Sequence, residues 1–154
     1  MGGAGPRPAG DDEVITAWGV VIEGYVGTQA RVMGEVATQC GLQPAPFDIL
    51  LRLLRTPGCR LPMTQLAREA ALSSGGFTKV ADRLVAAGLL CREPSAHDRR
   101  VVYAVLTEPG RALADRARRV CAEAIRRYVL EPLGPEPATA LGEAMQLLRA
   151  RHSG

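Results

Sequence analysis

The apolar positions of this chain follow helical spacing over most of its length and change to strand spacing only near the middle. Between Asp12 and Cys40, apolar residues recur at steps of three and four, which indicates a long amphipathic helix. Asp11 or Asp12 can cap its start, and Gly41 marks its end. The chain therefore begins, after a short tail, with one long helix.

Three shorter helical patterns follow. Pro44 suits the first turn of the second helix, which has no backbone donors to lose, and residues 60–62 are compatible with a short extended segment. A third, short helix is expected from about Thr64 to Ala71, and Ser73 or Ser74 can cap a fourth that ends before Gly88. The last two patterns together predict a helix, a tight turn and a second helix.

The strand spacing lies in two runs, residues 89–93 and 101–106, which alternate with a period of two and predict a β-hairpin. After it, Thr107 can cap a long helix that reaches about Leu130. A last helix is expected from about Glu136 to Arg151. The pattern predicts a mainly α (α+β) fold with a winged helix-turn-helix and a two-stranded wing.

The length of 154 residues and a hydrophobic content of 47% allow one substantial core, so one globular domain over residues 11–154 is the default. Two small lobes within one chain are also compatible with these values. Residues 1–10 have no apolar run typical of a signal peptide and are expected to be a flexible tail. Charged residues and glycines interrupt every apolar stretch, so a cytoplasmic protein with no membrane segment is expected.

The composition adds little about function by itself. The net charge is only +3, and Lys79 is the sole lysine among 19 basic residues. Arginine makes forked contacts with phosphate and guanine, but a codon-usage bias explains the excess equally well. The two histidines, His97 and His152, have no evident catalytic partner, and no nucleophile elbow or phosphate loop is present, so an enzyme is not expected.

The four cysteines are far apart and form no paired motif. They are Cys40, Cys59, Cys91 and Cys121. This spacing does not indicate a zinc site, and neither a metal nor a cofactor is expected. Buried apolar thiols are the main interpretation, and a redox sensor is the alternative.

The hairpin carries the most specific pattern. Asp98 and Arg100 lie at its tip, its second strand ends in Leu106 and Thr107, and Gly110 follows. Together with the preceding DRLVAAGLL, this DxR…LTxxG pattern resembles the multiple antibiotic resistance regulator (MarR) family over essentially the whole chain. The resemblance implies a homodimer that binds a pseudo-palindromic operator in double-stranded DNA. It also implies a winged core at about 44–107 and dimerisation helices at about 12–40 and 108–151.

The fourth helix is the expected recognition helix. Its first turn directs small and polar residues away from the buried stripe, and small residues there let the backbone approach phosphates or base edges. Thr78 and Lys79 are the leading candidates for base contacts. The candidate DNA-binding residues of this helix are Ser73, Ser74, Gly75, Gly76, Thr78 and Lys79.

The hairpin tip supplies the remaining DNA candidates. Arg100 matches the minor-groove arginine of the family, Asp98 matches the acid that would orient it, and Arg99 would then contact phosphate. A narrow minor groove has an enhanced negative potential that attracts a fixed positive charge. The alternative is that both arginines are only solvated hairpin charges.

Within the family, the chain is most similar to the urate-responsive branch. The similarity rests on Trp18, on Asp48 in PFDIL, on the LSSGG segment and on Arg92. Val80 stands where that branch carries its ligand-pairing arginine, so the resemblance does not imply urate itself.

The effector pocket is expected between the dimerisation helices and the winged core. Trp18, Tyr25 and Phe47 would form aromatic walls, and Asp48 would be the polar contact. The resemblance suggests a repressor released by a small aromatic or lipophilic ligand, whereas a plain core role explains the aromatic residues without a ligand. A redox-responsive regulator acting through Cys59 or Cys91 is the alternative, and a protein-interaction module is a third class.

Overall fold

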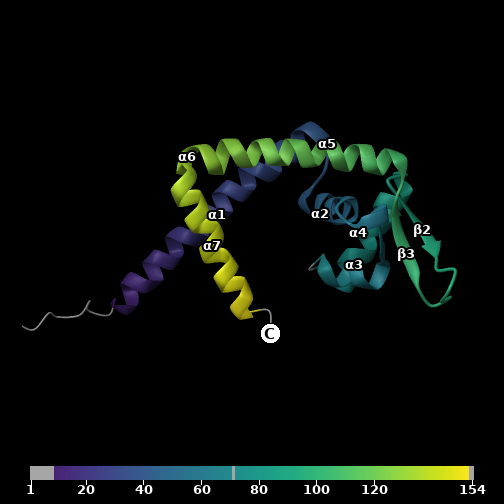
Figure 1. The fold of residues 1–154 in the computed structure, drawn as a ribbon, viewed down its shortest axis with the longest axis horizontal. Helices are drawn as coiled ribbons and strands as arrows, with labels where there is room; N and C mark the ends of the chain where they lie inside the picture. Colours follow the sequence, from purple (N-terminus) through teal and green to yellow (C-terminus); the bar gives the residue numbers. More distant parts are fainter. Residues whose placement is uncertain (1–8, 71, 153–154) are drawn as a thin grey trace, which may run out of the picture.

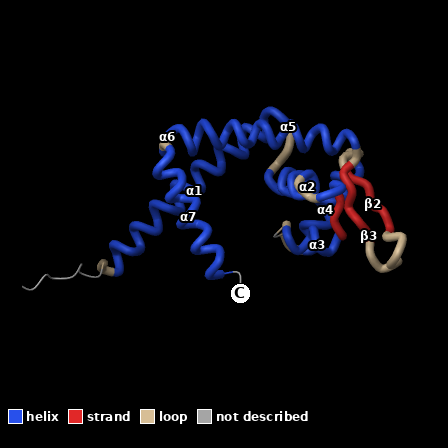
Figure 2. The backbone as a smooth tube through the Cα atoms, viewed as in Figure 1, coloured by secondary structure: helices blue, strands red, loops and turns tan. Residues whose placement is uncertain are grey.

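The computed structural model describes residues 9–70 and 72–152 and is mostly helical, with one small sheet (Figure 2). Residues 1–8 of the expected tail lie outside this description, as does Ala71, the expected end of the third helix. The elements, in chain order, are α1 (Asp11–Cys40), α2 (Pro44–Leu54), η1 (Pro57–Cys59), β1 (Arg60–Pro62), α3 (Met63–Glu69), α4 (Ser74–Ala86), β2 (Leu90–Pro94), β3 (Val102–Leu106), α5 (Glu108–Ile125), η2 (Arg126–Leu130), α6 (Glu131–Leu133) and α7 (Pro135–His152). Gly10, and not Asp11 or Asp12, is the N-cap of α1.

Two parts are distinguishable in Figure 1. The winged lobe consists of α2, α3, α4 and the sheet, and the helical arm consists of α1, α5, η2, α6 and α7. Helix α5 connects them, because it packs against α1 in the arm and against α2 in the lobe. The predicted mainly α fold with a winged helix-turn-helix is confirmed. No helix within residues 9–70 and 72–152 combines the length and hydropathy that a membrane crossing needs.

The sheet has one strand more than the predicted two-stranded wing. Its order is β1-β3-β2, with both pairs antiparallel, and Leu61 of β1 lies opposite Ala104 of β3. The extended segment at residues 60–62 is thus the third strand. Three residues are too few to show an alternating pattern, so its pairing has no sequence signal.

The core lies in the winged lobe and beneath α5. The largest fully buried side chains are Ile49, Leu50, Leu53, Leu66 and Val36. Burying a side chain of this size stabilises the fold by about 1.5 to 3 kcal/mol. No polar side chain in the described part of the chain is buried, so the side chains of this core make apolar contacts.

A tight junction attaches the wing to α5. The Thr107 hydroxyl accepts a hydrogen bond from the Gly110 amide at 3.1 Å and donates one to the Gly88 carbonyl at 2.6 Å. The expected cap of α5 is therefore confirmed. Gly110 is buried so close to the preceding hairpin that a Cβ placed on it would lie 1.9 Å from the Leu89 carbonyl oxygen. The LTxxG part of the motif thus has a steric explanation.

The long helix after the wing is less regular than expected. It changes to the π-helix η2 at Arg126–Leu130, continues through α6, and turns at Gly134, whose φ is +77°. Pro132 lies within the first turn of α6, so the helix continues beyond the end expected near Leu130.

Candidate nucleic-acid interface

The start of α4 is exposed, and its first turn is held by a cap from Ser73. Ser73 is the N-cap, and its hydroxyl accepts a hydrogen bond from the Gly76 amide at 3.1 Å. A Cβ on Gly76 would lie 2.9 Å from that same oxygen, whereas one on Gly75 would meet nothing within 4 Å. The side chain of Ser74 lies outside the described part of the structure. The backbone at this helix end can therefore approach another molecule closely.

The buried stripe of α4 fixes which residues face outward. Phe77, Ala81 and Leu84 are buried in the core, whereas Thr78 and Lys79 are at least partly exposed. The predicted recognition face is thus on the surface of the lobe, as the helical spacing requires.

The hairpin tip holds Arg100 in a forked contact. The backbone amide of Arg100 donates to Asp98 Oδ1 at 3.0 Å, its Nε to the same oxygen at 3.2 Å and its Nη2 to Oδ2 at 3.3 Å. The Arg100 amide, and then its guanidinium, lower the pKa of Asp98, so the carboxylate stays charged at neutral pH. The Arg100 side chain is nevertheless 91% exposed. Asp98 therefore orients an arginine that remains open to solvent.

The backbone of the tip is also well ordered by hydrogen bonds. The Ser95 hydroxyl accepts from the amides of His97 and Asp98, and the Val101 amide donates to the Asp98 carbonyl at 3.0 Å. Arg99 lies exposed beside Arg100. Figure 1 shows this loop extending from the lobe away from α5.

The four predicted pocket residues do not share one environment in the single chain. Phe47 is buried in the core, and Asp48 accepts a hydrogen bond from Arg52 at 2.8 Å. Trp18 and Tyr25 are 54% and 66% exposed on α1. Neither of two surface cavities in the described chain is lined by any of them, so the effector pocket stays a prediction.

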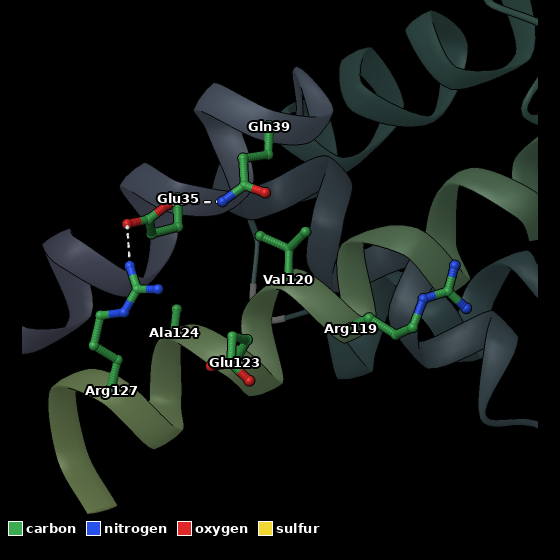
Figure 3. A pocket seen from close by; sticks show the side chains of 7 residues that line it. All are labelled: Glu35, Gln39, Arg119, Val120, Glu123, Ala124 and Arg127. Atoms are coloured by element: carbon green, nitrogen blue, oxygen red, sulfur yellow. Dashed lines mark hydrogen bonds and ion pairs between the residues drawn. The ribbon is translucent and has the colours of Figure 1, made fainter. Parts of the chain in front are cut away.

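The cavity in Figure 3 lies between α1 and the α5–η2 segment and has a volume of about 240 Å³. Figure 3 shows Arg127 pointing toward Glu35, whereas Arg119 points away from it. The lining residues are Glu35, Gln39, Arg119, Val120, Glu123, Ala124 and Arg127. Acidic and basic side chains compensate one another in this cavity, so it has no strong preference for an ion of either sign.

Glu35 links α1 to η2. It accepts a hydrogen bond from the Tyr128 hydroxyl at 2.8 Å and another from the Gln39 amide at 2.8 Å, and Arg127 lies 3.7 Å away. The Tyr128 hydrogen bond is the main cause that lowers the pKa of Glu35, followed by that of Gln39. No sequence pattern indicates this contact between α1 and η2, because its two residues are 93 positions apart.

Glu35→Gln is expected to remove a pH-dependent part of the stability. Because the folded-state pKa is lowered, the charged carboxylate stabilises the fold above the ordinary Glu pKa of about 4.3, and this stabilisation is lost as the pH falls through the lowered value. The melting temperatures of the two proteins should therefore differ at pH 7 and converge in acid. A difference that stays constant down to about pH 3 would contradict this assignment.

The cysteines lie in different surroundings. Cys59 is buried, with its thiol 3.9 Å from the Leu54 carbonyl, and the half-buried Cys91 thiol lies 3.9 Å from a Glu93 carboxylate oxygen. Burial raises the pKa of the Cys121 thiol. Reactive thiolates usually lie beside cationic groups. Within the described residues, no group of three or more His, Cys, Asp or Glu side chains is placed to hold a metal ion.

Sequence comparison connects this site to known regulators. The MarR family model matches residues 41–101, from the start of the winged lobe to the hairpin tip. The chain is 41% identical over 70 residues to the HTH-type transcriptional regulator MhqR of Bacillus subtilis, covering 46% of this chain and 47% of that protein. It thus spans about half the length of this relative. It is 24% identical over 111 residues to the multiple antibiotic resistance protein MarR of Escherichia coli, covering 72% of this chain and 76% of that protein.

Structural comparison extends the similarity to the helical arm. Sco3205, a MarR family transcriptional regulator from Streptomyces coelicolor solved in complex with DNA, superposes with a TM-score of 0.83 at 26% identity, covering 99% of this chain and 94% of that one. AbsC, a MarR family regulator from the same organism, gives 0.81 at 27% identity, covering 95% and 97%. By its sequence across the winged lobe and by its fold across both parts, the protein is similar to regulators of the MarR family.

Proposed function

We propose that this protein is a transcriptional regulator that binds double-stranded DNA through α4 and the wing. The observation that carries the proposal is the forked Asp98–Arg100 contact, which orients a guanidinium that is 91% exposed. So exposed an ion pair contributes little to stability, but a charge with a fixed direction suits insertion into a narrow minor groove. The structure of Sco3205 with DNA supports the same role.

In this proposal α4 lies in the major groove. The exposed glycine-containing first turn would approach the phosphates, and Thr78 and Lys79 would contact base edges. Arg99 would contact a phosphate beside the groove that receives Arg100. The wing and α4 together would then cover two adjacent grooves, and such a protein would act in the cytoplasm on chromosomal DNA.

The proposed binding unit is a homodimer. The first half of α1 and the length of α7 expose many apolar side chains, among them Trp18, Tyr25 and Leu147, the last of which is 71% exposed. Monomeric proteins rarely leave so continuous an apolar surface in contact with water. A second copy packed on these helices would bury it and present two α4 helices to the half-sites of a pseudo-palindromic operator.

The proposal extends to an effector. A small aromatic or lipophilic acid would bind where Trp18 and Tyr25 of one protomer would approach Asp48 in the proposed dimer, and it would release a repressor from its operator. Because Phe47 is buried in the core, it would support the pocket wall from behind and would not line its open side. A thermal shift together with operator release by a phenolic acid would support this role, and the absence of both across a library would contradict it.

DNase footprinting of the DNA beside its own gene tests the main proposal. The expected result is a protected inverted repeat. Fluorescence anisotropy at about 150 mM salt should then show binding to that duplex at least about 10³-fold tighter than to a scrambled duplex of equal composition. Equal affinity for both duplexes would contradict sequence-specific regulation and would favour a protein-interaction module.

A further inference from the structure

An ion pair joins the recognition helix to the wing. Arg92 Nη2 in β2 donates to Asp82 Oδ1 in α4 at 2.6 Å. Among the ion pairs of the described side chains, this is the one that connects α4 with the sheet. The contact therefore links the two elements that the proposed function assigns to DNA.

The location of Arg92 on the strand explains why the contact can form. Side chains alternate between the two faces of a strand, so Arg92 shares its face with Leu90, which is buried in the core. Leu90 lies opposite Leu106 at the base of the hairpin, and Arg92 lies opposite Ala104 nearer the tip. Arg92 therefore lies on the same face of β2 as the buried Leu90, but farther along the strand, where β2 becomes exposed.

Asp82 occupies the matching place on α4. It follows Thr78 by four residues and Lys79 by three, which places it one turn farther along the same side of the helix. Its side chain is 59% exposed, and that of Arg92 is 38% exposed. The pair lies at the surface between the proposed base-contacting turn of α4 and the outer half of the hairpin.

Stability alone does not explain this pair. Ion pairs with this exposure contribute little to folding because water screens them. Beyond Leu90, however, the residues of β2 are half-buried or exposed, and the buried residue of β3 opposite Arg92 is only an alanine, Ala104, so core packing holds the outer half of the hairpin weakly. A short charge-assisted hydrogen bond at this place restrains the direction of the wing.

We propose that Asp82 and Arg92 are positioning residues that fix the wing relative to α4, so that Arg100 and the α4 residues contact their grooves together. The proposal rests on the proposed DNA-binding function. When one element has bound, the second contact is intramolecular in either case, but a fixed wing makes it without the entropy cost of ordering a loose wing. Removing either charge therefore weakens DNA binding without removing a DNA contact.

Direct DNA contact is the competing explanation, and the sign of the effects separates the two. If Arg92 contacted a phosphate and Asp82 only repelled the DNA, Asp82→Asn would tighten binding while Arg92→Gln weakened it. A positioning pair requires both substitutions to weaken binding. It also requires that the charge-swapped protein, Asp82→Arg with Arg92→Asp, regain affinity because the pair re-forms with the opposite polarity.

The experiment measures operator affinity by fluorescence anisotropy on the footprinted duplex. Each single substitution is expected to weaken binding about five- to tenfold. The Asp82→Asn, Arg92→Gln double variant should be no weaker than the single variants, because the second change removes nothing further. The swapped protein should come within about threefold of the wild type. As a matched control, Arg118→Gln breaks the Asp115–Arg118 pair on α5 and should leave the affinity unchanged.

A second measurement needs no DNA. Amide hydrogen exchange at Ser95 and Val101 reports the order of the hairpin tip, because both amides donate within it. Exchange should be faster in Asp82→Asn and return to the wild-type rate in the swapped protein. Unchanged exchange and affinity, or tighter binding by Asp82→Asn, would overturn the positioning role. If the wild-type protein bound no duplex, the proposed function would be wrong. The exchange measurement would still test whether the Asp82–Arg92 pair orders the hairpin tip.

Discussion

Gly110→Ala is expected to lower the free energy of unfolding by about 3 kcal/mol. The new Cβ would lie 1.9 Å from the Leu89 carbonyl oxygen, and the obstacle is backbone, which cannot rotate out of the way. Either α5 or the hairpin must shift. That shift breaks the 2.6 Å hydrogen bond from Thr107 to Gly88 and the 3.2 Å bond from the Thr107 amide to Leu89.

Chemical denaturation at a fixed protein concentration measures this effect, since a dimer would make the transition depend on concentration. Gly34→Ala is the matched control, because the same change inside α1 brings the new Cβ within 4 Å of nothing. It should stabilise the helix by up to about 1 kcal/mol. Equal unfolding midpoints for the two variants would contradict the steric role of Gly110.

Arg100→Ala is expected to weaken operator binding by about tenfold or more while leaving the fold intact. The side chain is 91% exposed and pairs with Asp98 of its own hairpin, so its removal costs little stability, but it removes the charge proposed for the minor groove. The slope of log affinity against log salt should also fall by about 0.9 for each phosphate that the variant no longer neutralises. Circular dichroism should show the same helix content and melting temperature as the wild type.

Arg116→Ala provides the matched control for charge. Arg116 is also an exposed arginine, but it lies on α5, outside the proposed interface. Its removal should change operator affinity by less than about twofold, because a distant exposed charge is screened. If both variants weakened binding equally, or if Arg100→Ala bound like the wild type, the wing would not be the minor-groove element.

Local signals explain why much of the fold could be predicted from the sequence. The caps at Ser73 and Thr107 are hydroxyl residues before an apolar helical pattern, and their hydrogen bonds join residues only three apart. The pairing of Asp98 with Arg100 is equally local. The two caps follow from the identity and spacing of neighbouring residues, whereas the Asp98–Arg100 pairing was expected from the family resemblance.

The features that could not be predicted depend on tertiary docking. The β1 strand is recognisable only by its pairing with β3, and the Glu35–Tyr128 contact joins residues 93 positions apart. Asp82 and Arg92 could each be placed on an element, but their contact depends on the angle between a helix and a strand. The exposure of Trp18 could not be predicted either, because the helical pattern places it on an apolar face without showing what covers that face.

Helix α5 is attached to other elements at both ends, and it also packs against α1 and α2 between them. At its start, Gly110 packs tightly against Leu89 beside the wing. Just beyond its end, the Tyr128 hydroxyl in η2 donates a hydrogen bond to Glu35 in α1. Its 18 residues span about 27 Å, so a rotation of about 5° at one end displaces the other by about 2 Å. In the proposed dimer, a movement of this size in the arm would change the distance between the two α4 helices. Such a change is large enough to move a side chain out of hydrogen-bonding range of a base edge.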